Sequence, residues 1–255
     1  MKHYETCLNI CSWNVGGMKT NNQDKTMEKD FLEQVKNYDI VLLTETHVGY
    51  NNILNIDNFH YFPVCRQKSS NKRYFGGLGI FIKTNIRKGV TILQNSSTEF
   101  QWIKLKKDFF NFKNDIFVCL TYIAPQSSQY NNRLDYDILE LIKKDIIEKY
   151  GKQGDIIITG DFNARTGCDQ DYIPGDCTSH IPVDRTSYRV DDAVKDRYSC
   201  DLTIDTRGKE LLELCISNQL RILNGRTCGD SSGKFTCFNY AGNSVVDYFI
   251  ASERL

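Results

Sequence analysis

Short apolar runs rich in β-forming residues recur along the whole chain, and this recurrence most limits the folds that the sequence can adopt. Runs of about four to eight such residues, bounded by turn-forming residues, predict strands. They lie at Leu8–Val15, Asp39–Thr46, Tyr61–Arg66, Gly79–Lys83, Gly89–Leu93, Phe100–Lys106, Ile116–Tyr122, Asp155–Thr159, Arg221–Asn224, Lys234–Phe238 and Val245–Ala251. Because the strands occur in series with few helices between them, the pattern favours two sheets packed face to face.

Longer segments with the spacing of amphipathic helices interrupt the strands at Asp24–Asn37, Leu134–Tyr150 and Thr206–Leu220. In the first of them, Met27, Phe31 and Val35 recur at helical spacing and therefore share one face. A helix of this kind buries its apolar face against a neighbouring element. The predicted fold class is therefore α/β, as a four-layer α/β sandwich of two packed mixed sheets flanked by helices.

Length and composition indicate a single globular domain over residues 1–255, because the sequence has neither an internal repeat nor a linker. Hydrophobic residues make up 40% and charged residues 25% of the chain, values that exclude an intrinsically disordered chain and a fibrous protein. No apolar stretch approaches the roughly 20 residues that cross a bilayer. The first residues also lack the apolar core of a secretion signal. We therefore expect no association with a membrane.

The ten cysteines do not have the spacing of a disulfide framework or a zinc site. No pair shows C-x-x-C spacing, and the histidines are too scattered to complete a zinc site. Several cysteines lie in apolar runs, where cysteine behaves as a small buried side chain. Cys168, Cys177 and Cys200 share one polar region, where a local bridge is conceivable. The pattern favours a reduced, intracellular protein.

Basic and acidic residues balance, with 32 of each, which argues against a strongly basic nucleic-acid binder. Local basic side chains remain candidates for contact with backbone phosphates. They lie in polar loops, at Lys68, Lys72, Arg73, Arg185, Arg189, Lys195 and Arg197. Charged loops also occur simply as solvated surface. The last four belong to a long polar segment between Arg165 and Asp205, of a length that is commonly functional or disordered.

Polar side chains stand at or near the carboxyl ends of several predicted strands. These residues are Asn14, Glu45, Tyr122, Asp161 and Asn163, and a further carboxylate, Asp247, lies within the last predicted strand. Each alone also fits a structural role, as a surface charge, a turn residue or a partner for a backbone amide. A carboxylate within an apolar run, such as Asp247, is costly to bury without a partner. Because the residues hold similar positions on different strands, we expect them to line one pocket.

Such a pocket suits the hydrolysis of a phosphodiester. Magnesium prefers oxygen ligands, and proteins often hold it with one or two carboxylates together with substrate phosphate. Hydrolysis also needs a positioned water, a base and stabilisation of the charge that develops on the phosphate. Amides and a phenol contact phosphate oxygens without adding negative charge. The residues therefore predict a phosphodiesterase that uses magnesium, with manganese as the alternative ion.

Five motifs, in this order along the chain, resemble those of the endonuclease/exonuclease/phosphatase superfamily. They are Asn-Ile-Cys-Ser-Trp-Asn-Val-Gly-Gly (9–17), Leu-Leu-Thr-Glu-Thr-His (42–47), Thr-Tyr-Ile-Ala-Pro (121–125), Gly-Asp-Phe-Asn-Ala (160–164) and Ser-Val-Val-Asp-Tyr (244–248). Leu-Leu-Glu-Leu-Cys (211–215), Leu-Arg-Ile-Leu-Asn-Gly (220–225) and Phe-Thr-Cys-Phe (235–238) are most similar to the apurinic-type endonuclease domain of non-LTR retrotransposons. The resemblance implies the four-layer sandwich, hydrolysis of DNA and an intracellular, nuclear location.

The resemblance also implies a role for each candidate residue. Glu45 would be the main magnesium ligand, with Asn14 beside it at the metal or the phosphate. Tyr122 would contact the scissile phosphate. Asp161 would transfer a proton to or from the attacking water or the leaving oxygen, and Asn163 would orient the phosphate or the water.

Three further positions follow from the same resemblance. Thr236 stands where related endonucleases often have a polar contact to phosphate. Asp247 matches the aspartate that orients a catalytic histidine. His47 completes the Glu-Thr-His pattern and is expected to be a structural neighbour of Glu45 rather than a catalyst.

The sequence departs from the family at its last motif, a Ser-Asp-His on one further strand. None of the four histidines follows an aspartate. We therefore expect a C-terminally truncated domain or a degenerate copy that lacks the last strand and the catalytic histidine. The alternative function is a catalytically impaired remnant or a non-catalytic nucleic-acid-binding domain of the same fold.

Overall fold

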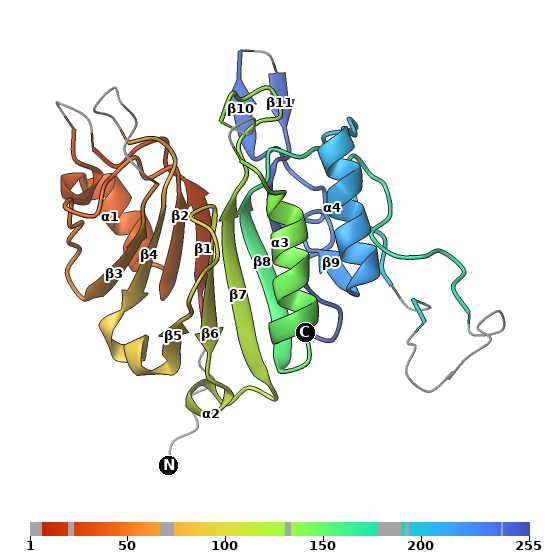
Figure 1. The fold of residues 1–255 in the computed structure, drawn as a ribbon, viewed down its shortest axis with the longest axis horizontal. Coiled ribbons are helices and arrows are strands. Elements are labelled where there is room, and N and C mark those ends of the chain that lie inside the picture. The colour runs from red at the N-terminus through yellow and green to blue at the C-terminus, as the bar shows by residue number, and fades with distance from the viewer. Residues whose placement is uncertain are drawn as a thin grey trace. The chain divides into compact units, whose positions relative to one another are not determined.

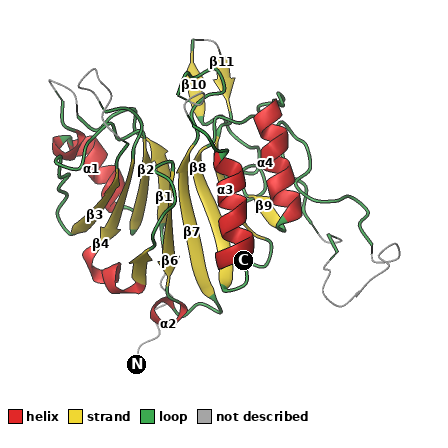
Figure 2. Cartoon of the chain, in the orientation of Figure 1, coloured by secondary structure: helices red, strands yellow, loops and turns green. Residues whose placement is uncertain are grey.

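The computed structural model describes residues 7–19, 23–66, 74–130, 134–177, 190–191, 194–240 and 242–255. Strands occur in series along these ranges, with helices between some of them, as drawn in Figure 1 and Figure 2. The chain forms two compact units. The first unit contains Met1–Ala124 and Tyr150–Phe162, and the second contains Pro125–Lys149 and Asn163–Leu255. The expectation of one domain over residues 1–255 stays a prediction.

The first unit contains a four-stranded mixed sheet with the strand order β1-β2-β4-β3. Its strands are β1 (Ile10–Asn14), β2 (Ile40–Thr44), β3 (Phe59–Val64) and β4 (Leu78–Lys83). β1 and β2 run parallel, whereas β4 is antiparallel to both of its neighbours. The parallel pair matters for the site, because it brings the carboxyl ends of β1 and β2 to the same edge.

A second run of paired strands in the first unit has the order β5-β6-β7-β8. These strands are β5 (Val90–Ile92), β6 (Phe100–Leu105), β7 (Asp115–Tyr122) and β8 (Gly154–Asp161). β5, β6 and β7 pair antiparallel, and β7 pairs parallel with β8. In that parallel register Tyr122 lies opposite Asp161, so two candidate site residues end neighbouring strands.

The two sheets of the first unit pack face to face, with β1 and β2 against β8 and β7. All five residues of β2 are buried. Val41 and Leu43 belong to a core cluster with Phe31 and Val35 of α1 (Lys29–Lys36), so α1 covers the other face of the four-stranded sheet. A strand that is buried on both faces has a continuous run of apolar residues, as β2 has. Two packed mixed sheets with helices confirm the predicted α/β sandwich class.

Some predicted elements differ in extent from those in the structure. The helix predicted over Leu134–Tyr150 is α3 (Ile138–Asp145) followed by a π-helical turn at Ile146–Tyr150. α3 begins after Asp137, whose carboxylate accepts a hydrogen bond from the backbone N–H of Glu140 at 3.0 Å and so caps the helix. The short helix α2 (Lys107–Phe110) was not predicted, because four residues are too few to show a helical period.

The second unit contains α3, α4 (Thr206–Ser217) and short strands. The strands are β9 (Leu220–Ile222), β10 (Cys237–Asn239), β11 (Gly242–Ser244) and β12 (Asp247–Ser252). α4 packs against α3 and against β9, and β9 pairs antiparallel with β12. β10 and β11 form a hairpin. The sequence predicted a strand over Lys234–Phe238 but missed β11, which is short and rich in polar residues.

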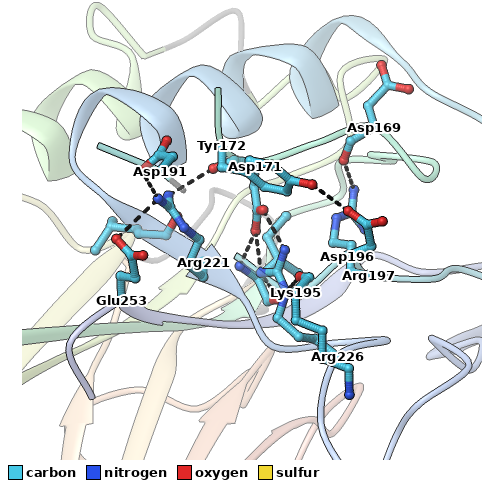
Figure 3. Close-up of polar contacts among 12 residues, drawn as sticks. Asp169, Asp171, Tyr172, Asp191, Lys195, Asp196, Arg197, Arg221, Arg226 and Glu253 are labelled. Carbon is cyan, nitrogen blue, oxygen red and sulfur yellow. Dashed lines mark hydrogen bonds and ion pairs between the residues drawn. The ribbon is translucent and has the colours of Figure 1, made fainter. Parts of the chain in front are cut away.

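An arginine–carboxylate network holds the second unit together (Figure 3). The carboxylate of Asp171 is fully buried and accepts two hydrogen bonds from the guanidinium of Arg226, at 2.8 and 2.7 Å. It also accepts the backbone N–H of Ile222 at 2.6 Å. Arg221 pairs with Asp191, and its Nη2 lies 3.3 Å from Glu253. The network thus fixes parts of the long polar segment onto β9.

Arg197 extends this network. It is only 4% exposed, and its Nη2 donates to the backbone carbonyls of Asp169 at 2.8 Å and Thr166 at 3.2 Å. These contacts anchor the long polar segment at Asp171, Asp191 and Arg197, while other described side chains of the segment, such as Lys195, are exposed. All ten cysteines are free thiols. No helix in the described ranges has the length and apolar character needed to cross a membrane.

The network gives a test of stability. Replacing Asp171 by asparagine leaves the buried guanidinium of Arg226 without its charge partner, which we expect to lower the unfolding free energy by about 3–5 kcal/mol. Urea unfolding followed by circular dichroism measures the change. The control is Lys29→Gln, which removes an exposed ion pair to Glu33 at 3.7 Å and should have little effect. Equal effects of the two substitutions would show that the network does not stabilise the unit.

Candidate functional site

Four of the predicted site residues meet at one edge of the first unit. Asn14 is the last residue of β1, Glu45 follows β2, Tyr122 ends β7 and Asp161 ends β8. Because each sheet contributes a parallel pair, all four strands present their carboxyl ends here. Strands β1 and β2 also face β8 and β7, so the residues come together from both sheets.

Asn14 connects the two carboxylates of this cluster. Its Nδ2 donates to Glu45 Oε1 at 2.9 Å and to Asp161 Oδ2 at 2.8 Å. Its Oδ1 accepts the backbone N–H of Gly16 at 3.0 Å, which fixes the orientation of the amide. The carboxylates of Glu45 and Asp161 both contact this amide, and their negative charges repel each other. The NH₂ group that donates to both offsets part of that repulsion. The three side chains form what we call the Asn14 bridge.

Glu45 is held in its ionised form. The pKa of its carboxyl falls to about 2, mainly through a hydrogen bond from His47, with further hydrogen bonds from Asn14 and Tyr122 against the opposing effect of burial. The Nε2 of His47 lies 3.3 Å from Glu45 Oε2. Glu45 is therefore a carboxylate throughout the physiological pH range. His47 is a direct neighbour of Glu45, as the sequence predicted.

The loop after β2 has an unusual backbone that presents these groups. Glu45 and His47 have φ values of 53° and 54°, in the left-handed region that side chains other than glycine rarely adopt. Each such residue costs about 1–3 kcal/mol, which the surroundings must offset. They do so through hydrogen bonds from Gly17 N to Glu45 O at 2.7 Å and from His47 N to Gly76 O at 2.9 Å. These hydrogen bonds hold the strained loop in the conformation that presents Glu45 and His47.

Gly17 makes room for the imidazole of His47. It has a φ of 100°, and a Cβ at this position would lie 3.2 Å from His47 Nδ1. Gly17 therefore lets the chain pass close to a partner of Glu45.

Tyr122 is 8% exposed and donates a hydrogen bond to Glu45. Burial raises the pKa of the phenol, and the negative charge of Glu45 raises it further, so Tyr122 stays protonated. The guanidinium carbon of Arg66 lies 5.1 Å from the centre of the Tyr122 ring. Sequence reasoning did not single out Arg66, because nothing in its local sequence indicates a partner so far along the chain.

The other predicted site residues belong to the second unit. Thr236 Oγ1 accepts the backbone N–H groups of Val246 and Asp247, at 3.1 Å each, so Thr236 and Asp247 are neighbours. The hydroxyl hydrogen of Thr236 is left to donate elsewhere. Asn163 has a φ of 46°, which again places a site candidate in the left-handed region. That Asn163 and Asp247 line one pocket with the Asn14 bridge stays a prediction.

The structure bears differently on each basic residue that was predicted to contact phosphate. For Arg197 the prediction is wrong, because its guanidinium is buried and bonds to backbone carbonyls. Lys195 is exposed, and its side chain remains a candidate. Lys68, Lys72, Arg73, Arg185 and Arg189 lie outside the described residues.

The donor set of the Asn14 bridge fits a hard divalent cation. It offers carboxylate oxygens from Glu45 and Asp161, the donor type that magnesium prefers. Within the described ranges, no group of three or more His, Cys, Asp and Glu side chains is arranged to hold a metal ion. A cation at the bridge would thus have few protein ligands and would keep several waters, as magnesium commonly does.

Solved structures share the fold at low sequence identity. An AP endonuclease from Archaeoglobus fulgidus is 14% identical with a TM-score of 0.61, over 98% of this chain and 88% of that one. The catalytic domain of APE2 from Xenopus laevis is 16% identical with a TM-score of 0.62, over 97% and 83%. A 3′ phosphatase from Neisseria, bound to a product DNA hairpin, is 13% identical with a TM-score of 0.56, over 97% and 88%. At these identities the likeness shows a common fold.

The sequence has no significant match among curated proteins. The family model named Endonuclease/Exonuclease/phosphatase family matches residues 11–255, a range that contains every predicted site residue. This match confirms the resemblance of the ordered sequence motifs at the level of the superfamily. The chain belongs to the endonuclease/exonuclease/phosphatase family.

Proposed function

We propose that this protein is a magnesium-dependent phosphodiesterase that nicks DNA, as the endonuclease domain of a non-LTR retrotransposon. The observation that carries the proposal is the Asn14 bridge, in which one amide holds two carboxylates at the carboxyl ends of parallel strands. Tyr122 adds a protonated phenol beside Glu45. These groups supply what phosphodiester hydrolysis requires: anionic oxygens for a cation, a proton acceptor and a neutral donor to phosphate.

DNA is the proposed substrate for two reasons. Two proteins of this fold are by name an AP endonuclease and a 3′ phosphatase solved with a DNA hairpin. The motifs at 211–215, 220–225 and 235–238 are most similar to apurinic-type endonuclease domains of retrotransposons. A domain with that task works on chromosomal DNA, so we place it in the nucleus.

Glu45 would hold the magnesium ion, with Asn14 beside it, and manganese is the alternative ion. When bound, the ion neutralises phosphate oxygens and lowers the pKa of a coordinated water. Glu45 suits this task because its carboxyl is already ionised. The hydrogen bond from Asn14 fixes where that carboxylate points.

Asp161 would accept the proton of the attacking water, and Asn14 keeps its carboxylate oriented. Tyr122, held protonated, would turn its one hydroxyl hydrogen from Glu45 to a non-bridging oxygen of the scissile phosphate when the substrate binds. Asn163 would orient the phosphate or the water, and Thr236 would donate its free hydroxyl hydrogen to a phosphate oxygen. Asp247 would act as a positioning residue beside Thr236, through the contact of its backbone N–H with the threonine hydroxyl.

Metal binding tests the role of Glu45 without reference to catalysis. We expect Glu45→Gln to weaken the affinity for Mg²⁺ by about 10–100-fold, because the neutral amide removes the main anionic ligand. Isothermal titration calorimetry, or Mn²⁺ electron paramagnetic resonance where binding is weak, measures the affinity. Asp115→Asn is the matched control, since Asp115 is an acidic residue at the opposite end of β7, paired with Lys104. An unchanged affinity in Glu45→Gln would assign the ion to another site.

Nicking of supercoiled plasmid in magnesium tests the role of Asp161. We expect Asp161→Asn to lower the rate by about 10²–10⁴-fold, because the amide no longer accepts a proton. Asp155→Asn is the control at the opposite end of the same strand, where the carboxylate accepts a hydrogen bond from Asn114 at 3.1 Å. It should nick at the rate of the unchanged chain.

The same assay distinguishes a nicking enzyme from the alternative function, a non-catalytic nucleic-acid-binding domain. A chain that binds DNA without nicking it in magnesium or manganese, and whose Asp161→Asn variant binds equally well, would be the non-catalytic nucleic-acid-binding domain. Nicking that persists in Asp161→Asn would instead mean that the proton acceptor lies elsewhere.

A further inference from the structure

We propose that Arg66, fixed by a buried ion pair with Glu99, is a positioning residue that holds the ring of Tyr122 in place for its contact with the scissile phosphate. The inference rests on the proposed function, because it concerns the same site. Arg66 would act through Tyr122 and would not touch the DNA.

The ion pair itself has the geometry of a rigid clamp. Arg66 Nε donates to Glu99 Oε1 at 2.8 Å, and Nη2 donates to Oε2, so one edge of the guanidinium binds both oxygens of the carboxylate. Thr98 Oγ1 adds a hydrogen bond to Oε1 at 3.0 Å. Arg66 is 9% exposed and Glu99 is 1% exposed. A buried ion pair contributes little net stability, because removing two charges from water costs about as much as their pairing gains. Stability alone therefore does not account for the pair of Arg66 and Glu99.

Glu99 and Arg66 hold Tyr122 from two directions. The backbone carbonyl of Glu99 accepts the N–H of Tyr122 at 3.0 Å and the hydroxyl of Thr121 at 3.1 Å, which fixes the backbone at the end of β7. The guanidinium carbon of Arg66 lies 5.1 Å from the centre of the Tyr122 ring, within cation–π range. One residue pair thus fixes both the main chain and the ring of Tyr122.

Gly76 fixes Arg66 from another side. A Cβ at Gly76 would lie 2.3 Å from Arg66 Nη1, and Gly76 has a φ of 66°. The guanidinium therefore lies directly against the backbone of this turn. The carbonyl of Gly76 accepts the N–H of His47, the partner of Glu45. Arg66 is thus in contact with Tyr122 and with the turn that holds His47.

This arrangement predicts an effect on rate rather than on binding. A side chain that contacts the reacting phosphate must be held closely, since a misplacement of about 1 Å can cost roughly 100-fold in rate. If Arg66 positions Tyr122, its loss should lower kcat and leave KM unchanged. If the ion pair were only structural, its loss would lower stability and leave kcat of the folded protein unchanged.

The kinetic test uses Arg66→Met, Arg66→Lys and Tyr122→Phe in the full chain. We expect Arg66→Met to lower kcat for plasmid nicking by about 10–100-fold at unchanged KM. The kcat of Arg66→Lys should lie between that of the unchanged chain and that of Arg66→Met, because lysine keeps the charge but loses the planar, bidentate contact. In the Tyr122→Phe background, Arg66→Met should have little further effect, since residues that act through one group are not additive. Full additivity, or a change in KM alone, would overturn the inference.

Arg221→Met is the matched control, because Arg221 is also a buried arginine paired with a buried carboxylate, that of Asp191. It should lose stability and keep its kcat. Should Arg66→Met fail to fold, Arg66→Met combined with Glu99→Leu removes both charges, and such replacements are often neutral for stability. That double variant should show the same loss of kcat.

A spectroscopic measurement separates this inference from the proposed function. The ring ¹³C–¹H resonances of Tyr122, assigned with Tyr122→Phe, are recorded in DNA-free protein. In Arg66→Met they should shift, whereas those of Tyr248, buried in the second unit, should not. Unchanged Tyr122 resonances would overturn the positioning role whatever the nicking rates. If the unchanged chain does not nick DNA while the Tyr122 resonances shift, the proposed function fails and the positioning of the ring stands.

Discussion

The side-chain amide of Asn14 is the interaction on which the rest of the site depends. Two carboxylates close together repel each other, and here one NH₂ group donates to both, at 2.9 and 2.8 Å. That contact is available only because β1 and β2 run parallel in one sheet, β7 and β8 run parallel in the other, and the sheets face each other. The left-handed backbone at Glu45 then turns its carboxylate toward Asn14. The chemistry of the site follows from the topology of the sandwich.

Much of this site could be predicted from the sequence, because a strand end is a local feature. Fully apolar runs such as the one in β2 mark buried strands, and the polar residues that follow each run mark its end. That reasoning reached Glu45 and Asp161 from their residue type and their position after such a run. It did not reach Arg66 and Glu99, which pair over 33 residues of sequence. Contacts of that range depend on how strands are ordered in a sheet, and no short motif encodes the order.

Arg66 was missed as a site residue, whereas Arg197 was wrongly predicted to contact phosphate. Its surroundings in the sequence are polar, so it was predicted to lie at the surface beside other charges. In the structure the guanidinium of Arg197 is buried against carbonyls of the same long segment, and the fully buried carboxylate of Asp171 forms an ion pair with Arg226 (Figure 3). Burial of charge depends on whether partners arrive from distant segments. Composition alone therefore does not separate an exposed polar loop from one fastened by ion pairs.

The Asn14 bridge also ties the existence of the site to the integrity of the fold. Its donor belongs to one sheet and one of its acceptors to the other, so neither sheet alone contains the site. The strained residues Glu45 and His47 have no local reason to keep their conformation once the turns at Gly17 and Gly76 separate from them. A chain in which the sheets have parted, even with every strand intact, holds no preformed site. A partly folded copy of this protein would consequently lack the Asn14 bridge, which forms only where the two sheets pack together.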